Sequence, residues 1–248
     1  MKTVPLSARH AHSAAALHIQ VINTGFISSL GIDFVTALYE AIAKSASSFG
    51  FAVEDNDKVL GFVTFTTNLS RLYKSIIAKK GWRFALLLAG KMFSVKRIKK
   101  VFETLFYPSR VKKMHLPDAE LLSIAVDPEK YHNGLATKLV QKSLEHCRKI
   151  GLDKVKVLVA AANEPANKLY MKCGFQLVGQ IDSHGATSNI YQAATDTALL
   201  QHSVHKSSKP STQPILSERT HSVLPLLEPV SIGFFAARRQ KLHRKRSA

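Results

Sequence analysis

The stretch "YHNGLATKLVQKSLEHCRKIG", residues 131–151, decides the fold of the second half of the chain. Apolar residues recur at helical spacing from Leu135 to Cys147, and Gly151 stands where such a helix would end. Gly134 precedes the helix and can take a positive φ, which lets the backbone approach a ligand closely. The first N–H groups of a helix have no internal partner and lie at the positive end of its dipole. The stretch therefore predicts a turn and helix start whose chemistry suits a diphosphate.

This turn is a weak signal by itself, because a glycine near a helix start is often only a chain reversal. It is not a P-loop, since no Gly-Lys-Ser/Thr follows at the required spacing, and it lacks the further glycines of the GxGxxG fingerprint. An ordinary turn and an anion site both fit this stretch when it is considered alone.

A second motif follows the apolar run "KVKVLVAA" (154–161), which has the composition of a strand. Asn163, Asn167 and Tyr170 stand four and three residues apart, so on a helix they lie within about 40° of one another. An apolar stripe runs beside this polar line, and together they predict a helix with one edge in a cleft. For this helix alone, surface polar residues at chance spacing are the alternative.

The remaining chain up to residue 196 alternates between helix and strand patterns. Helices are expected over 8–20 and 33–46, with Ser7 and Asp33 as capping residues. The expected strands are a hairpin over 49–67 around the turn "DNDK", and 119–126, 154–161, 175–182 and 188–194.

The positive charge of the chain is concentrated in two segments. The 248 residues carry a net charge of +18, and 46% of them are hydrophobic, which is enough for a proper core. Residues 69–113 hold thirteen Lys and Arg against one acid, and residues 200–248 hold nine against two. The rest of the chain is close to neutral. Such segments predict an anionic partner: phosphate groups, nucleic acid or a lipid surface.

The two basic segments have different patterns. Residues 69–116 are expected to form an insertion of two or three short amphipathic helices, broken at Gly81 and Gly90. From about residue 197 the composition turns to Ser, His, Pro and Lys, which predicts a mostly disordered basic tail over 197–248. Residues 1–196 then form the folded domain.

Cysteine usage and apolar runs favour a cytoplasmic protein. Cys147 and Cys173 fall on apolar helix faces and are expected to be buried thiols, since no His–Asn pattern supports Cys173 as a nucleophile. No signal peptide is recognisable, and the longest apolar run, "FALLLAGKMF", is too short to span a bilayer. A peripheral position at a membrane remains open.

The two motifs together resemble the GCN5-related N-acetyltransferases (GNAT), over residues 50–66 and 118–192. That family's pyrophosphate turn is written Q/R-x-x-G-x-G/A. Here Tyr131 replaces the leading Gln/Arg, which weakens one side-chain contribution and leaves the backbone contribution intact. The family pattern N-x-x-A-x-x-L-Y-x-K-x-G-F fits at every stated position from Asn163 to Phe175. The resemblance implies an α/β (α+β) fold with a mixed, mostly antiparallel central sheet flanked by helices.

The resemblance also implies acetyl-CoA as co-substrate, with no metal. Backbone groups of Ile124, Ala125 and Val126 would pair with the pantetheine arm, as an added strand would. The remaining contacts to coenzyme A would come from the turn, the start of its helix and the two asparagines: His132, Asn133, Gly134, Leu135, Ala136, Thr137, Asn163 and Asn167.

Two further residues would carry the chemistry that the resemblance implies. Tyr170 looks like the general acid that donates a proton to the departing sulfur. Glu120, at the start of the central strand, is the first candidate for the base that deprotonates the attacking amine, with Asp118 and His132 as alternatives.

The predicted reaction is direct transfer of an acetyl group to the amine of a small, anionic acceptor, such as an amino sugar nucleotide. The acceptor would lie between the N-terminal helices and the basic insertion. Two alternatives stay open: acetylation of a protein or peptide, and a non-catalytic protein of this fold that binds nucleic acid or an anionic membrane through 69–113 and 238–246. O-acetylation and the oligomeric state are open too, and a dimer is compatible with the sequence.

Overall fold

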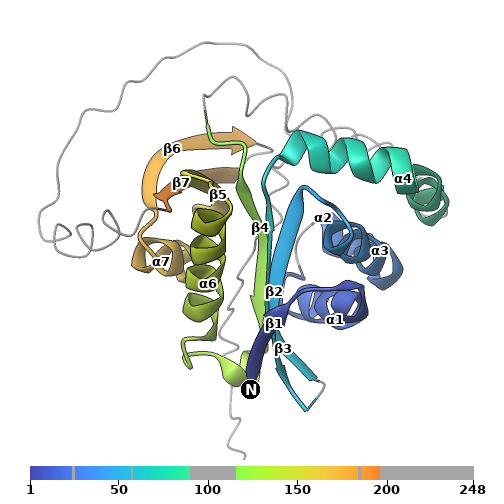
Figure 1. Ribbon diagram of the computed structural model, residues 1–248, viewed down its shortest axis with the longest axis horizontal. Coiled ribbons are helices and arrows are strands. Elements are labelled where there is room, and N and C mark those ends of the chain that lie inside the picture. The colour runs from blue at the N-terminus through green and yellow to red at the C-terminus, as the bar shows by residue number, and fades with distance from the viewer. Residues whose placement is uncertain (24–25, 57, 90–115, 184–185, 196–248) are drawn as a thin grey trace, which may run out of the picture.

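A mixed sheet lies at the centre of the protein, whose computed structural model describes residues 1–23, 26–56, 58–89, 116–183 and 186–195 (Figure 1). The strand order in that part of the chain is β1-β2-β3-β4-β5-β7-β6. The strands are β1 (Lys2–Pro5), β2 (Ser48–Asp55), β3 (Lys58–Thr66), β4 (Glu120–Val126), β5 (Lys154–Ala160), β6 (Gln176–Ser183) and β7 (Ala186–Ala194). Every neighbouring pair is antiparallel except β4 and β5, which confirms the expected mixed, mostly antiparallel sheet.

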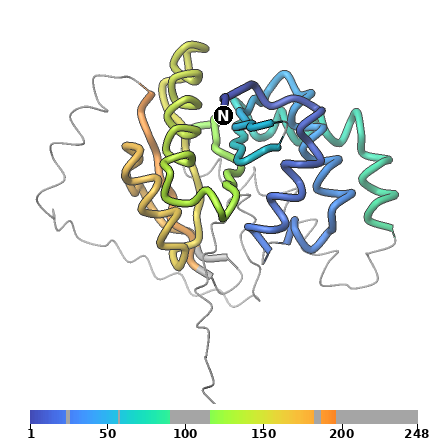
Figure 2. Tube along the Cα trace, turned by 90° about the horizontal axis from the view of Figure 1, so that it is seen from below, coloured from blue at the N-terminus to red at the C-terminus, as the bar shows by residue number. Residues whose placement is uncertain are grey.

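Helices cover both faces of this sheet (Figures 1 and 2). The α-helices are α1 (Ala11–Val21), α2 (Phe26–Ser29), α3 (Ile32–Ala43), α4 (Leu69–Ala89), α6 (Leu135–Lys149) and α7 (Glu164–Lys172), and the 3-10 helices are η1 (Ala8–His10) and η3 (Pro128–Lys130). α1, α3 and α4 bury one apolar core, and α6 and α7 bury another. We call these two sides the α1–α3 face and the α6–α7 face.

A β-bulge in β4 determines which side chains of this strand pack into each of the two cores. Thr64 of β3 pairs with Ser123 and Phe65 pairs with Leu121, so Leu122 is the extra residue. Leu121 belongs to the core of the α6–α7 face, whereas Leu122 belongs to that of the α1–α3 face. Ser123 also contacts the α1–α3 face, through Tyr39 of α3. The bulge therefore turns two consecutive side chains of β4 towards the same face.

Most of the expected elements are confirmed. The hairpin over 49–67 forms β2 and β3, and the helix after Gly134 runs as α6 to Lys149. Ser7 caps η1 as expected, but Asp33 lies inside the first turn of α3, whose N-cap is Gly31 with a φ of 83°. The predicted tail over 197–248 lies outside the described residues.

The predicted break at Gly81 is wrong. α4 runs through Gly81 as one helix of 21 residues, from Leu69 to Ala89, and residues 90–115 lie outside the described part of the chain. A glycine inside a helix costs about 1 kcal/mol relative to alanine. Burial of three apolar side chains on this helix offsets that cost: Leu69, Leu72 and Ile76. Across the residues described, no helix has the length and apolar character to cross a membrane.

Candidate active site

β4 and β5 run parallel but pair at one end. In the described part of the chain, Glu120 and Lys156 are their register pair, and the Lys156 N–H donates to the Ala119 carbonyl at 3.0 Å. Each strand keeps a long ladder on its other side, β4 with β3 and β5 with β7. Beyond this pair, β4 has no ladder with β5, so the backbone of residues 124–126 at the facing edge of β4 can accept a partner from elsewhere.

The turn before α6 has the geometry of an anion site. His132 and Gly134 adopt positive φ values of 65° and 71°, and residues 132–134 are exposed. The Lys138 N–H donates to the Gly134 carbonyl at 3.0 Å and so begins the helical hydrogen bonds. Three earlier N–H groups of the helix are left without helical partners: those of Leu135, Ala136 and Thr137. The space above Gly134 is open, because a Cβ built there meets no heavy atom within 4 Å.

The two asparagines of the polar line have different surroundings. Asn163 Oδ1 caps α7 by accepting an N–H of its first turn at 3.3 Å, while its Nδ2 is buried with no hydrogen-bond partner in the described structure. Asn167 Nδ2 donates to the carbonyls of Ala160 (3.0 Å) and Asn163 (2.7 Å). Asn167 Oδ1 accepts from Asn189 Nδ2 at 2.7 Å and from the Tyr191 hydroxyl at 2.8 Å. Because a buried donor without a partner is costly, Asn163 is the amide suited to a ligand, and Asn167 braces the end of β5.

Tyr170, the third member of the line, is 1% exposed. Its ring packs against Phe175 and Tyr191, with centroids 5.6 and 6.4 Å away. Its hydroxyl makes no hydrogen bond to any other residue that the structure describes. Burial, with a smaller effect from the Cys173 thiol, raises the pKa of the Tyr170 phenol above its usual range. The phenol therefore keeps its proton at neutral pH, as a proton donor must.

Glu120 and Lys156 form a buried ion pair at the paired end of the two strands. Glu120 is 4% exposed and Lys156 is 2% exposed, with 3.4 Å between Nζ and Oε2. Lys156 Nζ also donates to the Pro117 carbonyl. Burial raises the pKa of Glu120, and the Lys156 ammonium opposes that rise. The Glu120 charge in turn adds to the effect of burial in raising the pKa of Tyr73 on α4.

The site residues predicted from the sequence form two groups along β5. Asn163, Asn167 and Tyr170 lie by the end of this strand, where Asn167 holds the Ala160 carbonyl. Glu120 lies four residues back, beside Lys156, which is about 13 Å along a strand. On β4, the buried residues 124–126 continue past the bulge towards the turn before α6.

The alternative bases lie in exposed positions. Asp118 is exposed, and its Oδ2 accepts from Asn68 Nδ2 at 2.9 Å. His132 is exposed in the turn before α6. Of the three candidates, Glu120 is the buried one, and burial gives it the raised pKa that suits a base working near neutral pH.

A buried polar chain on the α1–α3 face was missed by the sequence patterns. His18 Nδ1 lies 2.7 Å from the Tyr39 hydroxyl, which lies 2.9 Å from Ser123 Oγ, and Thr64 Oγ1 is 2.8 Å from the same Ser123 atom. Burial lowers the pKa of His18 to about 4, so the ring is neutral at physiological pH. The chain joins α1 and α3 to the bulge of β4. Ser123 was the available signal, because it is a polar residue inside the apolar strand "LLSIAV".

Both cysteines lie inside the protein as thiols. Cys147 and Cys173 are free and buried as expected, and burial raises the pKa of both thiols to about 12, which leaves them protonated. Among the residues that the structure describes, no group of three or more His, Cys, Asp or Glu side chains is placed to hold a metal ion.

Comparison with known proteins points to one family. A model of the acetyltransferase (GNAT) family matches residues 20–175. No curated protein matches the sequence of this chain significantly.

Solved structures of N-acetyltransferases share this fold. The ribosomal-protein-S18-alanine N-acetyltransferase from Escherichia coli is 14% identical with a TM-score of 0.50, over 79% of this chain and 94% of that one. A mutant of the spermidine N-acetyltransferase from Vibrio cholerae is 17% identical with a TM-score of 0.50, over 82% and 99%. An N-acetyltransferase from Staphylococcus aureus Mu50 is 18% identical with a TM-score of 0.52, over 79% and 100%. At these identities the likeness shows the fold alone.

Proposed function

The chain belongs to the acetyltransferase (GNAT) family, and we propose that it moves the acetyl group of acetyl-CoA to the amine of a small, anionic acceptor in a ternary complex. The observation that carries this proposal is the single register pair between β4 and β5. It leaves the backbone of residues 124–126 facing a strand with which it has no ladder. An extended pantetheine arm can supply the missing hydrogen bonds, as an added strand does.

The neighbouring groups fit the other parts of coenzyme A. The buried Asn163 Nδ2, which has no partner in the described structure, would donate to a carbonyl of the pantetheine. The exposed turn at 132–134 and the free N–H groups of residues 135–137 would bind the pyrophosphate. Asn167 would act indirectly, because its side chain is occupied in holding β5 and Tyr191.

The reaction needs two proton transfers, and two side chains are suited to them. The amine nitrogen forms a bond to the acetyl carbon as the carbon–sulfur bond breaks. Glu120 would take the proton released by the amine, directly or through water, since its burial raises the carboxyl pKa. Tyr170 would donate its proton to the departing sulfur. Backbone N–H groups of β4 near the bulge would stabilise the oxyanion.

The test is turnover on a panel of amines, with and without Tyr170→Phe. We expect the purified protein to be stabilised thermally by acetyl-CoA and to acetylate a member of the panel. Tyr170→Phe should lower turnover by about 100-fold or more, because a positioned acid contributes that much. The same variant should keep its stabilisation by acetyl-CoA. Turnover within about twofold of wild type would remove Tyr170 from the mechanism.

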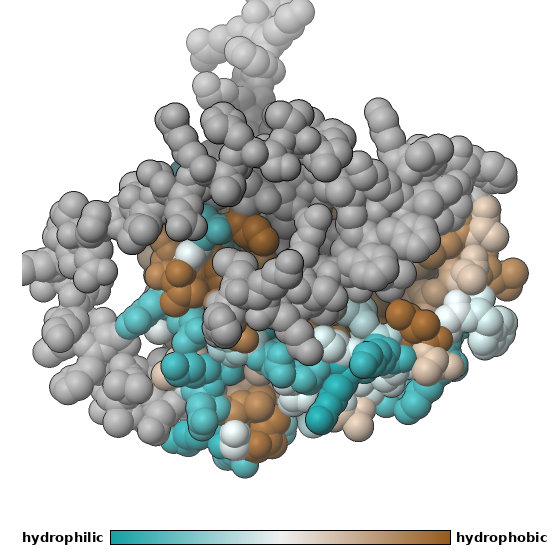
Figure 3. Space-filling model, turned by 90° about the horizontal axis from the view of Figure 1, so that it is seen from above, coloured by the Kyte–Doolittle hydropathy of each residue, from teal (hydrophilic) through white to brown (hydrophobic). Residues whose placement is uncertain are grey.

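A second candidate is attachment to an anionic membrane surface, and the exposed side of α4 favours it. Trp82 is 72% exposed, Leu86 70% and Ile77 53%, on a helix that also carries lysines. Figure 3 shows apolar side chains gathered at the right-hand end of the molecule, where Figure 1 places the far end of α4. An amphipathic basic helix of this kind can lie in a lipid interface.

Stabilisation by heparin or anionic vesicles, with none by acetyl-CoA, would favour surface binding over catalysis. Acetylation of peptides alone would favour a protein substrate.

A further inference from the structure

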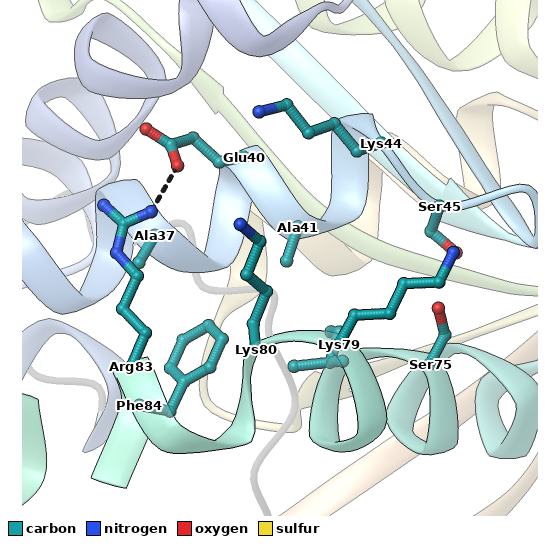
Figure 4. A pocket seen from close by; sticks show the side chains of 11 residues that line it. Ala37, Glu40, Ala41, Lys44, Ser45, Ser75, Lys79, Lys80, Arg83 and Phe84 are labelled. Carbon is teal, nitrogen blue, oxygen red and sulfur yellow. Dashed lines mark hydrogen bonds and ion pairs between the residues drawn. The ribbon is translucent and has the colours of Figure 1, made fainter. Parts of the chain in front are cut away.

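The groove between α3 and α4 carries an excess of positive charge (Figure 4). Lys44 of the α3 end and three residues of α4 supply it: Lys79, Lys80 and Arg83. We propose that this groove binds a phosphate or diphosphate group of the acceptor and so selects phosphorylated amines. This proposal rests on the proposed function.

The ion pairing within the groove leaves its lysines available. Arg83 Nη1 lies 2.7 Å from Glu40 Oε2, so this pair is neutralised within the groove. Lys44, Lys79 and Lys80 have no carboxylate partner among the residues that the structure describes. Figure 4 shows Lys80 extending from α4 towards α3, and Lys79 reaching towards Ser45. These ammonium groups give the groove a positive charge that no described carboxylate offsets, and a phosphate oxygen accepts charge-assisted hydrogen bonds from such groups.

Two hydroxyl groups, those of Ser45 and Ser75, lie at the end of the groove that Lys79 reaches (Figure 4). Ser45 Oγ is 3.0 Å from Ser47 Oγ, and Ser75 on α4 makes no hydrogen bond to another described residue. Hydroxyls that can both donate and accept suit the polar body of an acceptor better than its charged end. The groove is therefore lined by Lys80 and the Arg83–Glu40 pair in its middle, and by hydroxyl groups beside Lys79 at the Ser45 end.

The serine end of the groove is the end closer to Glu120. Ser47 accepts a hydrogen bond from Thr66, and Thr66 is the register partner of Glu120. On α4, the Glu120 charge acts on Tyr73, which lies seven residues before Lys80. Seven residues of helix span about 10 Å. An acceptor with its phosphate at Lys80 can thus extend its amine towards the paired end of β4 and β5.

The same charges exclude another class of acceptor. A polyamine would bring ammonium groups into a groove whose Lys44, Lys79 and Lys80 have no described carboxylate partner, and repulsion between like charges disfavours its binding. We therefore expect acetylation of phosphorylated amines, with linear polyamines as poor acceptors.

The experiment measures inorganic pyrophosphate binding to the full chain by titration calorimetry, in the presence and absence of saturating CoA. CoA occupies the turn at 132–137, so pyrophosphate binding that persists with CoA reports a second site. Lys79→Ala/Lys80→Ala should weaken that binding by about tenfold or more, because charge-assisted hydrogen bonds to phosphate are lost. Lys142→Ala/Lys149→Ala on α6 removes the same charge from an exposed surface. This control should stay within about twofold of wild type.

Each outcome bears on one claim. Equal loss in both double variants, or no pyrophosphate binding to the CoA-saturated protein, would overturn the groove site. Loss of binding to phosphatidylglycerol vesicles in the groove variant, with pyrophosphate binding unchanged, would also overturn it and assign these lysines to a lipid surface. Failure of acetyl-CoA or CoA to bind counts against the proposed function alone, because the loss of pyrophosphate binding in Lys79→Ala/Lys80→Ala still tests the groove without CoA.

Discussion

The two faces of the sheet differ in the sequence separation between the residues that make up their functional groups. On the α6–α7 face, the turn, the capping asparagine and Tyr170 all come from residues 131–175. On the α1–α3 face, the buried polar chain joins Tyr39 to Ser123, which are 84 positions apart. The groove on that face likewise joins α3 to α4. The part that would bind acetyl-CoA is thus a local structure, and the part that would meet the acceptor depends on tertiary packing.

The largest effect should come from Glu120, at the paired end of β4 and β5. Glu120→Gln keeps the shape of the side chain and removes its basicity, so we expect turnover to fall by about 100-fold or more. Asp118→Asn is the matched control, because Asp118 is exposed two positions earlier, and it should be nearly silent. Steady-state rates of the two variants show whether Glu120 or Asp118 is the general base. A large loss in Asp118→Asn alone would move the base to the loop.

The pH profile refines the same assignment. A base must be ionised, so kcat/KM should fall as the pH drops through the raised pKa of Glu120. Lys156→Met removes the charge that opposes this rise, so the acid limb of the profile should move to higher pH. An unmoved limb would mean that another group titrates there.

The next effect concerns the stability of the α1–α3 face. Burial lowers the pKa of His18 from 6.5 to about 4, so the unfolded chain binds the extra proton between these two values. Stability is therefore lost as the pH falls from about 6.5 towards 4, by up to about 3 kcal/mol. His18→Gln should remove this part of the pH dependence, measured as the free energy of unfolding by urea at pH 7 and pH 4.5. His12→Gln, on the exposed side of α1, should retain it. Equal pH dependence in the two variants would show that another group is responsible.

A smaller effect tests the turn on the α6–α7 face. Gly134 has a φ of 71° and Gly151 has a φ of 75°, and a Cβ at either position meets nothing within 4 Å. Alanine at each should cost about 1–2 kcal/mol of stability through backbone strain alone. Gly134→Ala should also raise the KM for acetyl-CoA several-fold, whereas Gly151→Ala, at the other end of α6, should leave it unchanged. An equal KM in both would place the pyrophosphate elsewhere.

The sequence predicts the α6–α7 face well because its signals are local. A glycine before a helical pattern and an asparagine after a strand depend on neighbours in the chain, and the structure places both as expected. Periodicity gives the face of a helix but not the partner of a side chain. Asn167 shows this limit. It lies on the predicted polar line, yet its side-chain nitrogen and oxygen both form hydrogen bonds within the protein.

The α1–α3 face was harder to predict for the opposite reason. His18 and Tyr39 look like ordinary residues of amphipathic helices, and their hydrogen bond exists only after α1 and α3 pack on the sheet. Ser123 and Lys156 are polar residues within apolar strands, so the sequence shows that each needs a buried partner without showing which.

The smallest effect concerns Gly81, where the sequence predicted a break and the structure has a continuous helix. A Cβ at Gly81 would lie 3.8 Å from Ile77 Cγ2, which is an ordinary van der Waals contact. Gly81→Ala should therefore stabilise the protein by about 0.5–1 kcal/mol, since alanine removes the entropy cost of glycine in a helix. The free energy of urea unfolding measures this gain. α4 forms one wall of the groove, and alanine at position 81 should leave the course of this helix as it is. The variant should therefore also leave pyrophosphate binding to the CoA-saturated protein unchanged. Destabilisation by alanine would instead mean that Gly81 needs a backbone angle that alanine resists, and that α4 bends there as the local pattern predicted.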